Sequence, residues 1–349
     1  MRNKKRRSNR EWVEKRKRSG RKKLTIGLSA ASVLAVMCCF IIVAAAAPPP
    51  ETAKAPTEPA AVKAAETEAE TETAPAQPAA KPEPPAEKAT EPVDLPVLMY
   101  HHLDTVSNYG TVVSEEVFRR QMEAVRDAGY HAVGVDQLIA FVDDSAPLPE
   151  KPVLITFDDG YASNLKIGAP ILKETGLKAT IFVIGRDEAD YYYGDTESYF
   201  LEHFTYDLAQ PWVNLGVLDV QCHSYDMHHA LRYGGTGRDG MLRQEGESEE
   251  DYRAAIAADL KSFSVRRDRC VFPPLTALAF PYGYYNDELD QVLADCGIRL
   301  TFTIENRVNR LEPGNPGCLR KMGRINVVDR CGPETLLNLM ARPGSVSGS

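Results

Sequence analysis

Residues Val153-Leu-Ile-Thr-Phe-Asp-Asp-Gly-Tyr161 join an apolar, β-branched run to two adjacent carboxylates and a glycine. The run predicts a buried strand, and Asp158-Asp159-Gly160 predicts its exit into a loop. Neighbouring side chains on a strand point to opposite sides, so both carboxylates can face one pocket only where the strand gives way to a turn, which Gly160 can supply. Asp-Gly is also the commonest turn dipeptide, and on its own this stretch favours an ordinary strand end.

A second apolar run that ends in polar residues changes this interpretation. Val217 to Cys222 predicts another strand, His223 follows it directly, and His228 comes five residues later. Two neutral imidazoles and one carboxylate are the ligands of an open catalytic zinc-type site, and a second carboxylate beside them would serve as a base. A lone histidine is more often a core or surface residue, but this pair follows a strand end just as the aspartates do.

The N-terminal part of the chain predicts a membrane anchor. Residues 1–23 are dense in Lys and Arg, and residues 24–47 are uncharged and almost wholly apolar, which is longer than the roughly twenty residues that span a bilayer. The positive-inside bias places residues 1–23 in the cytoplasm and everything after residue 47 outside the cell. Ala44-Ala45-Ala46 would also suit a signal peptidase, in which case the protein is secreted.

Composition divides the rest of the 349-residue chain into a linker and a folded domain. Residues 48–93 consist mainly of Pro, Ala, Glu and Thr without any aromatic residue, which predicts a disordered tether. Residues 94–349 are predicted to form the catalytic domain. The net charge of −8 includes the basic N-terminal segment, so this domain is strongly acidic, which argues against nucleic acid and suits a neutral substrate or a cationic product.

The cysteines indicate neither a zinc ribbon nor a disulfide framework. The seven cysteines fall at positions 38, 39, 222, 270, 296, 318 and 331, without any CxxC pair. Cys222 is expected to be a packed thiol, and disulfides among Cys270, Cys296, Cys318 and Cys331 stay open. The oligomeric state also stays open.

Strands alternate with helices throughout the folded region. About eight strand candidates begin near residues 96, 132, 153, 179, 217, 277, 300 and 322, and short turns join them to helices, which predicts parallel β/α architecture. Candidate polar residues follow the C-terminal ends of several separate strands, which is where barrel enzymes carry their active sites. We therefore expect a (β/α) barrel of about seven to eight strands rather than an open sheet.

Three sequence motifs occur in the order found in a known family. Thr156-Phe-Asp-Asp-Gly-Tyr161, His223-Ser-Tyr-Asp-Met-His228 and Ala279-Phe-Pro-Tyr-Gly283 resemble those of the polysaccharide deacetylases of carbohydrate esterase family 4. The resemblance covers roughly residues 95–335. It implies a distorted (β/α) barrel, a divalent metal, and hydrolysis of acetyl groups from N-acetylglucosamine polymers or acetylated sugars.

The resemblance also implies roles for individual residues. Asp158 matches the family's base, Asp159, His223 and His228 match its metal ligands, and Tyr282 matches the residue whose backbone N–H binds the oxyanion. The metal expected is Zn²⁺, with Co²⁺, Ni²⁺ or Mn²⁺ as alternatives. The two histidines are five residues apart rather than the more usual four. Together with Met99-Tyr-His-His102, this spacing looks like the branch that contains the biofilm poly-N-acetylglucosamine deacetylases.

Two family features are missing from their usual places. No histidine follows His229, and no arginine precedes the Pro-Tyr-Gly turn, so the catalytic acid and the orienting arginine must come from elsewhere. A departing amine needs a proton, and histidine titrates in the useful range. His101 directly follows the strand that ends at Tyr100, so we assign it as the acid, with His102 as its substitute; alternatively, His101 only orients an aspartate by a hydrogen bond. Arg324, which lies in a predicted strand, completes the set of candidate catalytic residues.

These features predict a membrane-tethered, metal-dependent hydrolase that removes acetyl groups from N-acetylglucosamine residues of an extracellular or cell-wall polysaccharide. Two alternatives stay open. One is an esterase that acts on O-acetyl groups, as on xylan, and the other is a non-catalytic glycan-binding module on the same fold.

Overall fold

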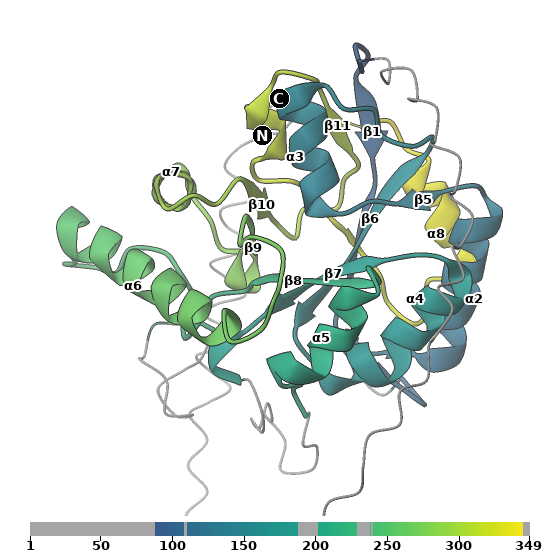
Figure 1. Cartoon of the computed structure of the whole chain (residues 1–349), viewed down its shortest axis with the longest axis horizontal. Helices are drawn as coiled ribbons and strands as arrows, with labels where there is room; N and C mark the ends of the chain where they lie inside the picture. Colours follow the sequence, from purple (N-terminus) through teal and green to yellow (C-terminus); the bar gives the residue numbers. More distant parts are fainter. Residues whose placement is uncertain (1–87, 108–109, 188–201, 229–237, 239, 345–349) are drawn as a thin grey trace, which may run out of the picture. The chain divides into compact units, whose positions relative to one another are not determined.

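The computed structural model describes residues 88–107, 110–187, 202–228, 238 and 240–344 (Figure 1). They all belong to one compact unit, Ala79–Ser349. The basic segment 1–23, the expected membrane span 24–47 and the tether up to residue 87 lie outside the described residues. Within the described part of the chain, none of the helices is long and apolar enough to cross a membrane.

The centre of the domain is an eight-stranded sheet in which all neighbouring strands are parallel. Its order is β10-β9-β8-β7-β6-β2-β12, and β5 pairs with β6. The strands are β2 (Val97–Tyr100), β5 (His131–Ala132), β6 (Pro152–Asp159), β7 (Ala179–Val183), β8 (Leu218–Cys222), β9 (Ala277–Ala279), β10 (Leu300–Phe302) and β12 (Ile325–Asn326). Each of the eight strands expected from the sequence is therefore present.

The sheet curls until its two ends meet. Met322, just before β12, accepts a backbone hydrogen bond from Thr303 at 2.8 Å and donates one to Thr301 at 2.8 Å, so this segment lies beside β10. This closure confirms the irregular (β/α) barrel. Two small pairs lie apart from the sheet: β1 (Val93–Leu95) with β11 (Asn309–Leu311), and β3 (Leu103–Asp104) with β4 (Val113–Ser114).

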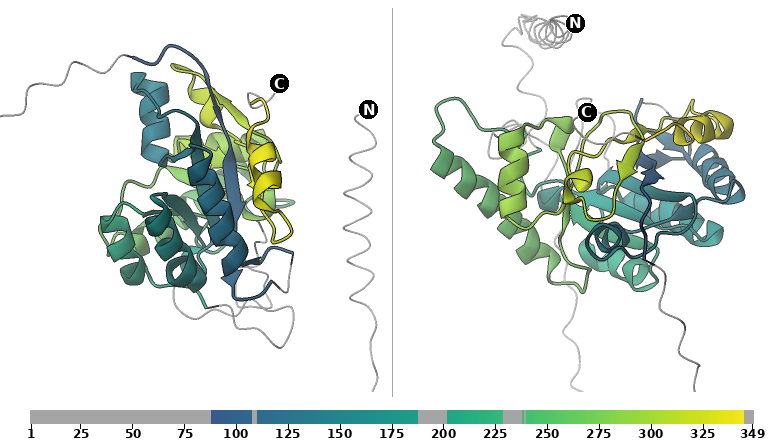
Figure 2. Two further views of the ribbon diagram at one scale, coloured as in Figure 1. Left: turned by 90° about the vertical axis from the view of Figure 1, so that its right-hand side faces the viewer. Right: turned by 90° about the horizontal axis from the view of Figure 1, so that it is seen from above.

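Helices follow the strands and cover the outside of the sheet (Figures 1 and 2). The α-helices are α2 (Glu115–Asp127), α3 (Val135–Asp144), α4 (Ala169–Thr175), α5 (Tyr206–Asn214), α6 (Glu249–Arg267), α7 (Asp287–Asp295) and α8 (Pro333–Met340). Single turns are η1 (Asn164–Gly168), η2 (Gly185–Asp187), η4 (Pro281–Gly283) and η5 (Pro316–Leu319). The longest of these, α6, begins after Ser248, whose side chain accepts a hydrogen bond from the Asp251 N–H.

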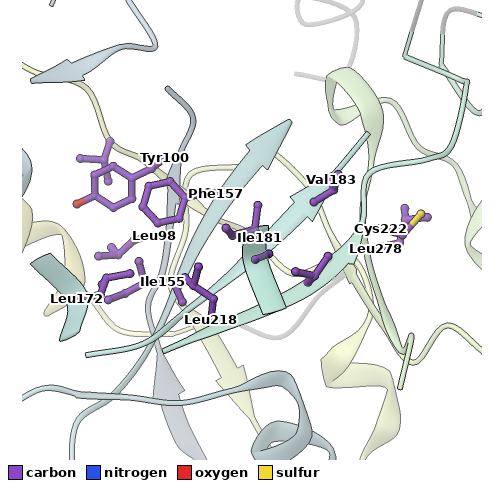
Figure 3. Packing of buried hydrophobic residues seen from close by; sticks show 14 of the residues in the cluster. Leu98, Tyr100, Ile155, Phe157, Leu172, Ile181, Val183, Leu218, Cys222 and Leu278 are labelled. Carbon is purple, nitrogen blue, oxygen red and sulfur yellow. The ribbon is translucent and has the colours of Figure 1, made fainter. Parts of the chain in front are cut away.

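Strand alternation divides the core into an outer and an inner layer. On the outer face, Tyr100 meets Phe118 of α2 edge to face, with ring centroids 5.1 Å apart, and Phe157 and Ile181 belong to the same cluster (Figure 3). On the inner face, Phe182 of β7 and Phe302 of β10 have ring centroids 5.1 Å apart, although two strands separate β7 from β10 in the sheet. These two rings meet across the barrel interior, which is therefore filled by side chains.

The five described cysteines, Cys222, Cys270, Cys296, Cys318 and Cys331, are all free thiols. Burial raises the pKa of the Cys222 thiol well above its ordinary value, so this residue behaves as a packed apolar side chain rather than as a thiolate.

Candidate active site

Asp158 points into the barrel at the C-terminal end of β6. It alternates in phase with Leu154 and Thr156, whereas Ile155 and Phe157 face the outer helices. Its side chain is buried and binds the Arg324 guanidinium through both oxygens, with Nη1 to Oδ1 at 2.6 Å and Nη2 to Oδ2 at 2.8 Å. This bidentate geometry fixes the plane of the carboxylate.

Arg324 is itself fully buried and is held from several sides. Its Nε donates to the Thr303 carbonyl at 2.9 Å, and its guanidinium carbon lies 5.8 Å from the centroid of the Phe182 ring. Burial by itself would raise the pKa of Asp158, but the charge of Arg324 and the nearby histidines outweigh burial, and the pKa lies well below the ordinary value of 3.8. Asp158 is therefore ionised at every pH at which the protein would work.

Asp159 lies at the same site because the backbone turns at this residue. Its φ of 75° lies in the left-handed region, which non-glycine residues rarely adopt. Ser224 after β8 has a φ of 68°, and Tyr282 after β9 has a φ of 57°. Three strand ends beside the site thus each carry a non-glycine residue in a conformation that costs on the order of 1–3 kcal/mol, and such strain is concentrated at functional sites.

Asp159, His223 and His228 form a buried cluster of metal-ligand type. One ligand atom from each lies within 4.8 Å of the other two. The Nε2 atoms of His223 and His228 are 3.5 Å and 3.8 Å from Asp159 Oδ1. His223 Nδ1 is 2.8 Å from the Ala279 carbonyl, which can only accept a hydrogen bond, so Nδ1 carries the hydrogen and the Nε2 lone pair faces the cluster.

Tyr282 contacts His228 with its side chain. Its ring centroid is 4.1 Å from that of His228, and its hydroxyl donates to the His228 carbonyl at 2.7 Å. Tyr282 is 38% exposed, so part of this residue faces solvent beside His228. Sequence reasoning assigned only the backbone N–H of Tyr282 and missed this contact with His228.

His101 and His102 diverge after β2. His101 Nε2 is 4.0 Å from Asp158 Oδ2, and the Asn164 amide donates to the His101 carbonyl at 2.8 Å. His102 Nδ1 is 3.0 Å from Ser163 Oγ, its Nε2 is 3.9 Å from Asp104, and burial lowers its pKa. His101 is therefore the member of the pair that lies beside the aspartates. At 4.0 Å it makes no hydrogen bond to Asp158, so Arg324 rather than His101 orients that carboxylate.

The structure brings all seven candidate residues to one end of the barrel, through direct contacts or shared neighbours. Asp158 connects Arg324 with His101, Asp159 connects His223 with His228, and Tyr282 packs on His228. Sequence reasoning missed Asp259, a buried α6 residue that binds the loop between the two histidines. Nothing in the sequence of α6 distinguishes this aspartate from the solvent-facing acids of the same helix.

Comparison with known proteins shows what this part of the chain is similar to. Residues 145–301 match the family model described as polysaccharide deacetylase. The chain is 28% identical over 218 residues to a putative polysaccharide deacetylase, YxkH, of Bacillus subtilis, covering 62% of this chain and 67% of that protein. It is 26% identical over 212 residues to the poly-β-1,6-N-acetyl-D-glucosamine N-deacetylase of Escherichia coli K12, covering 56% of this chain but only 31% of the relative.

A solved structure shares the fold. IcaB from Ammonifex degensii superposes with a TM-score of 0.57 at 22% identity, covering 73% of this chain and all of that one. Residues 145–301 of this chain therefore resemble the polysaccharide deacetylases, a family of hydrolases.

Proposed function

We propose that this protein hydrolyses acetamide groups of N-acetylglucosamine residues in an extracellular or cell-wall polysaccharide and releases acetate. The observation that carries the proposal is the buried Asp159, His223 and His228 cluster beside a carboxylate that Arg324 keeps ionised. The similarity to enzymes named poly-β-1,6-N-acetyl-D-glucosamine N-deacetylases supports the choice of glycan.

The donor set of the cluster fits a divalent metal. Two imidazoles and one carboxylate match a catalytic zinc-type site that keeps a position open, and His223 presents Nε2 because its Nδ1 is bound to the Ala279 carbonyl. Asp159, His223 and His228 would hold the ion. When bound, a divalent ion supplies a Lewis acid that polarises the acetamide carbonyl and acidifies water. Zn²⁺ is the expected ion, with Co²⁺, Ni²⁺ and Mn²⁺ as alternatives.

Asp158 is the proposed general base. It adjoins Asp159 in the chain, is buried, and remains ionised because Arg324 neutralises it at hydrogen-bond distance. An ionised carboxylate with a fixed plane can accept a proton from the attacking water without first having to reorient.

His101 is the proposed acid, and Tyr282 the proposed oxyanion donor. His101 Nε2 is 4.0 Å from Asp158, so a leaving nitrogen bound between them would be within reach of both residues. The left-handed backbone at Tyr282 would aim its N–H toward the developing oxyanion, and its side chain would keep His228 in place.

The proposed location follows from the sequence alone. A span at residues 24–47 and a tether at residues 48–93 would hold the catalytic domain outside the cell, where polymeric N-acetylglucosamine is found.

Acetate release by the full-length chain tests the proposal. The substrates are β-1,6- and β-1,4-linked N-acetylglucosamine oligomers, peptidoglycan and acetylated xylan. Each is assayed with the metal-free protein and with the same protein after addition of Zn²⁺. We expect Zn²⁺-dependent release, fastest from the β-1,6-linked oligomers. Release from xylan alone would instead establish an O-acetyl esterase, and absence of release together with absence of bound metal would leave a glycan-binding module.

A further inference from the structure

The loop between the two proposed histidine ligands is held by a buried carboxylate on α6. Both oxygens of Asp259 accept consecutive backbone N–H groups of this loop, Tyr225 N–H to Oδ2 at 2.7 Å and Asp226 N–H to Oδ1 at 2.9 Å. The side chain of Asp259 is buried. It lies 33 and 34 residues further along the chain than the amides it binds.

The backbone of the loop is shaped to receive an anion. Ser224 has a left-handed φ of 68°, and the two N–H groups that follow it converge on one carboxylate. Successive N–H groups that point the same way form a concave site with a positive potential, which a negative group complements. Asp259 fills that site from within the protein.

The other side of the loop is bound to η2. Gly185 N–H donates to the Ser224 carbonyl at 3.0 Å, and Arg186 N–H donates to the Tyr225 carbonyl at 2.9 Å. The Arg186 Nη1 also donates to both oxygens of Asp226 at 2.9 Å. The loop therefore lies between α6 and η2. On the α6 side, the Asp259 side chain binds the amides of Tyr225 and Asp226.

The burial of Asp259 opposes folding, which makes a purely stabilising role a poor explanation. Burial raises its pKa to about 6, and the two N–H groups offset this only in part. Burial of a charge that is only partly compensated costs folding free energy.

We propose that Asp259 is a positioning residue of the metal site. It fixes the Ser224–Met227 loop so that His228 faces Asp159 and His223. His223 directly follows β8 and is held by the Ala279 carbonyl, whereas His228 follows the loop, so the position of His228 depends on how the loop is held. This inference rests on the proposed metal-dependent function.

Asp259→Asn in the full-length chain tests the inference, with Zn²⁺ as the probe. The amide NH₂ faces one of the two loop N–H donors, so the loop loses an acceptor and gains a clash between donors. Loss of a group that orients a ligand typically weakens metal binding about 10–100-fold, and we expect a rise of that size in the Zn²⁺ Kd, measured by competition with a chelator of known affinity. The thermal midpoint of the metal-free chain should not fall, because a buried charge is removed.

Asp268→Asn is the matched control. It makes the same substitution at the end of the same helix, where the side chain is 66% exposed, and should change neither the Kd nor the midpoint. Arg186→Met removes the side-chain contact with Asp226 on the other side of the loop, leaves the two backbone hydrogen bonds from η2 in place, and should also raise the Kd. This variant decides the question if Asp259→Asn does not fold.

A lower midpoint for Asp259→Asn with a Kd within twofold of wild type would show a merely structural role and overturn the inference while leaving the proposed function intact. If the wild-type chain binds no Zn²⁺, the proposed function and the inference both fall.

Discussion

Replacement of Arg324 by methionine should lower the free energy of unfolding, because it leaves the buried carboxylate of Asp158 without its cationic partner. Arg324 is completely buried, donates to both carboxylate oxygens at 2.6 Å and 2.8 Å, and donates to the Thr303 carbonyl at 2.9 Å. Removal of one partner of a buried ion pair leaves an uncompensated charge, which typically destabilises a protein by about 3–5 kcal/mol. Since domains are stable by about 5–15 kcal/mol, we expect Arg324→Met to fold at neutral pH with little stability to spare.

Urea unfolding at pH 7 measures this cost. The set comprises the wild-type chain, Arg324→Met, Asp158→Asn and the double variant. Because the double variant leaves neither charge of this pair unpartnered, it should be more stable than the sum of the single effects predicts, with a coupling free energy of about 1–3 kcal/mol. A loss below about 1 kcal/mol for Arg324→Met, or a double variant without coupling, would refute the reasoning.

The pH dependence of the same variant gives an independent check. In the wild type the folded pKa of Asp158 lies below the ordinary 3.8, so the pair contributes stability above that pH and loses it as the pH falls further. Without Arg324, burial dominates and the folded pKa rises above the unfolded value, so ionisation of Asp158 destabilises the variant as the pH rises. The stability deficit of Arg324→Met should therefore be smaller at pH 5 than at pH 8, and a constant deficit would contradict this account.

Four further predictions concern single side chains. Asp158→Asn should lower acetate release by at least about 100-fold while leaving the Zn²⁺ content unchanged, and near-normal turnover would exclude Asp158 as the base. His101→Ala should lower acetamide hydrolysis by about 10²–10⁴-fold but spare an aryl acetate, whose phenolate leaves without a proton; equal losses on both substrates would exclude a leaving-group acid. Tyr282→Phe removes the 2.7 Å bond to the His228 carbonyl, worth about 1 kcal/mol, and should raise the Zn²⁺ Kd about fivefold, whereas an unchanged Kd would leave only the backbone role. The pKa of Asp259 is about 6 in the folded chain and about 3.8 in the unfolded chain, so the wild type loses stability as the pH rises through this range. Between pH 4 and pH 7 the free energy of unfolding of Asp259→Asn, measured in urea, should rise relative to that of the wild type by on the order of 3 kcal/mol. A difference that does not change with pH would contradict the raised pKa.

The barrel and the strand ends that carry the site were predictable because both depend on local patterns. Each strand has an apolar run with a turn at its end, as in Val153–Gly160, and parallel strands bring their C-terminal ends to one face. This reasoning placed the aspartates of β6 beside the histidines after β8 without any knowledge of tertiary contacts.

Contacts between residues far apart in the sequence were not predictable. Arg324 and Asp158 are 166 positions apart, and nothing in the Met-Gly-Arg-Ile segment indicates that its guanidinium lies in the barrel interior. The left-handed backbone of Ser224 and Tyr282 gave no signal either, because neither residue is a glycine or asparagine, the types that usually adopt it. Such conformations are imposed by the surrounding structure and not by residue type.

The pairing of Arg324 with Asp158 bears on the identity of the acid. A carboxylate that stays ionised can accept a proton but has none to donate at the start of a turnover, so base and acid catalysis must come from different groups. Asp159 is turned toward the two imidazoles, and His223 and His228 are turned toward Asp159. His101, whose Nε2 approaches Asp158 to 4.0 Å while its side chain remains 21% exposed, lies where a leaving nitrogen could be reached. The contact between Arg324 and Asp158 supports His101 as the acid as much as the position of His101 after β2 does, and Arg324 and His101 should be tested together.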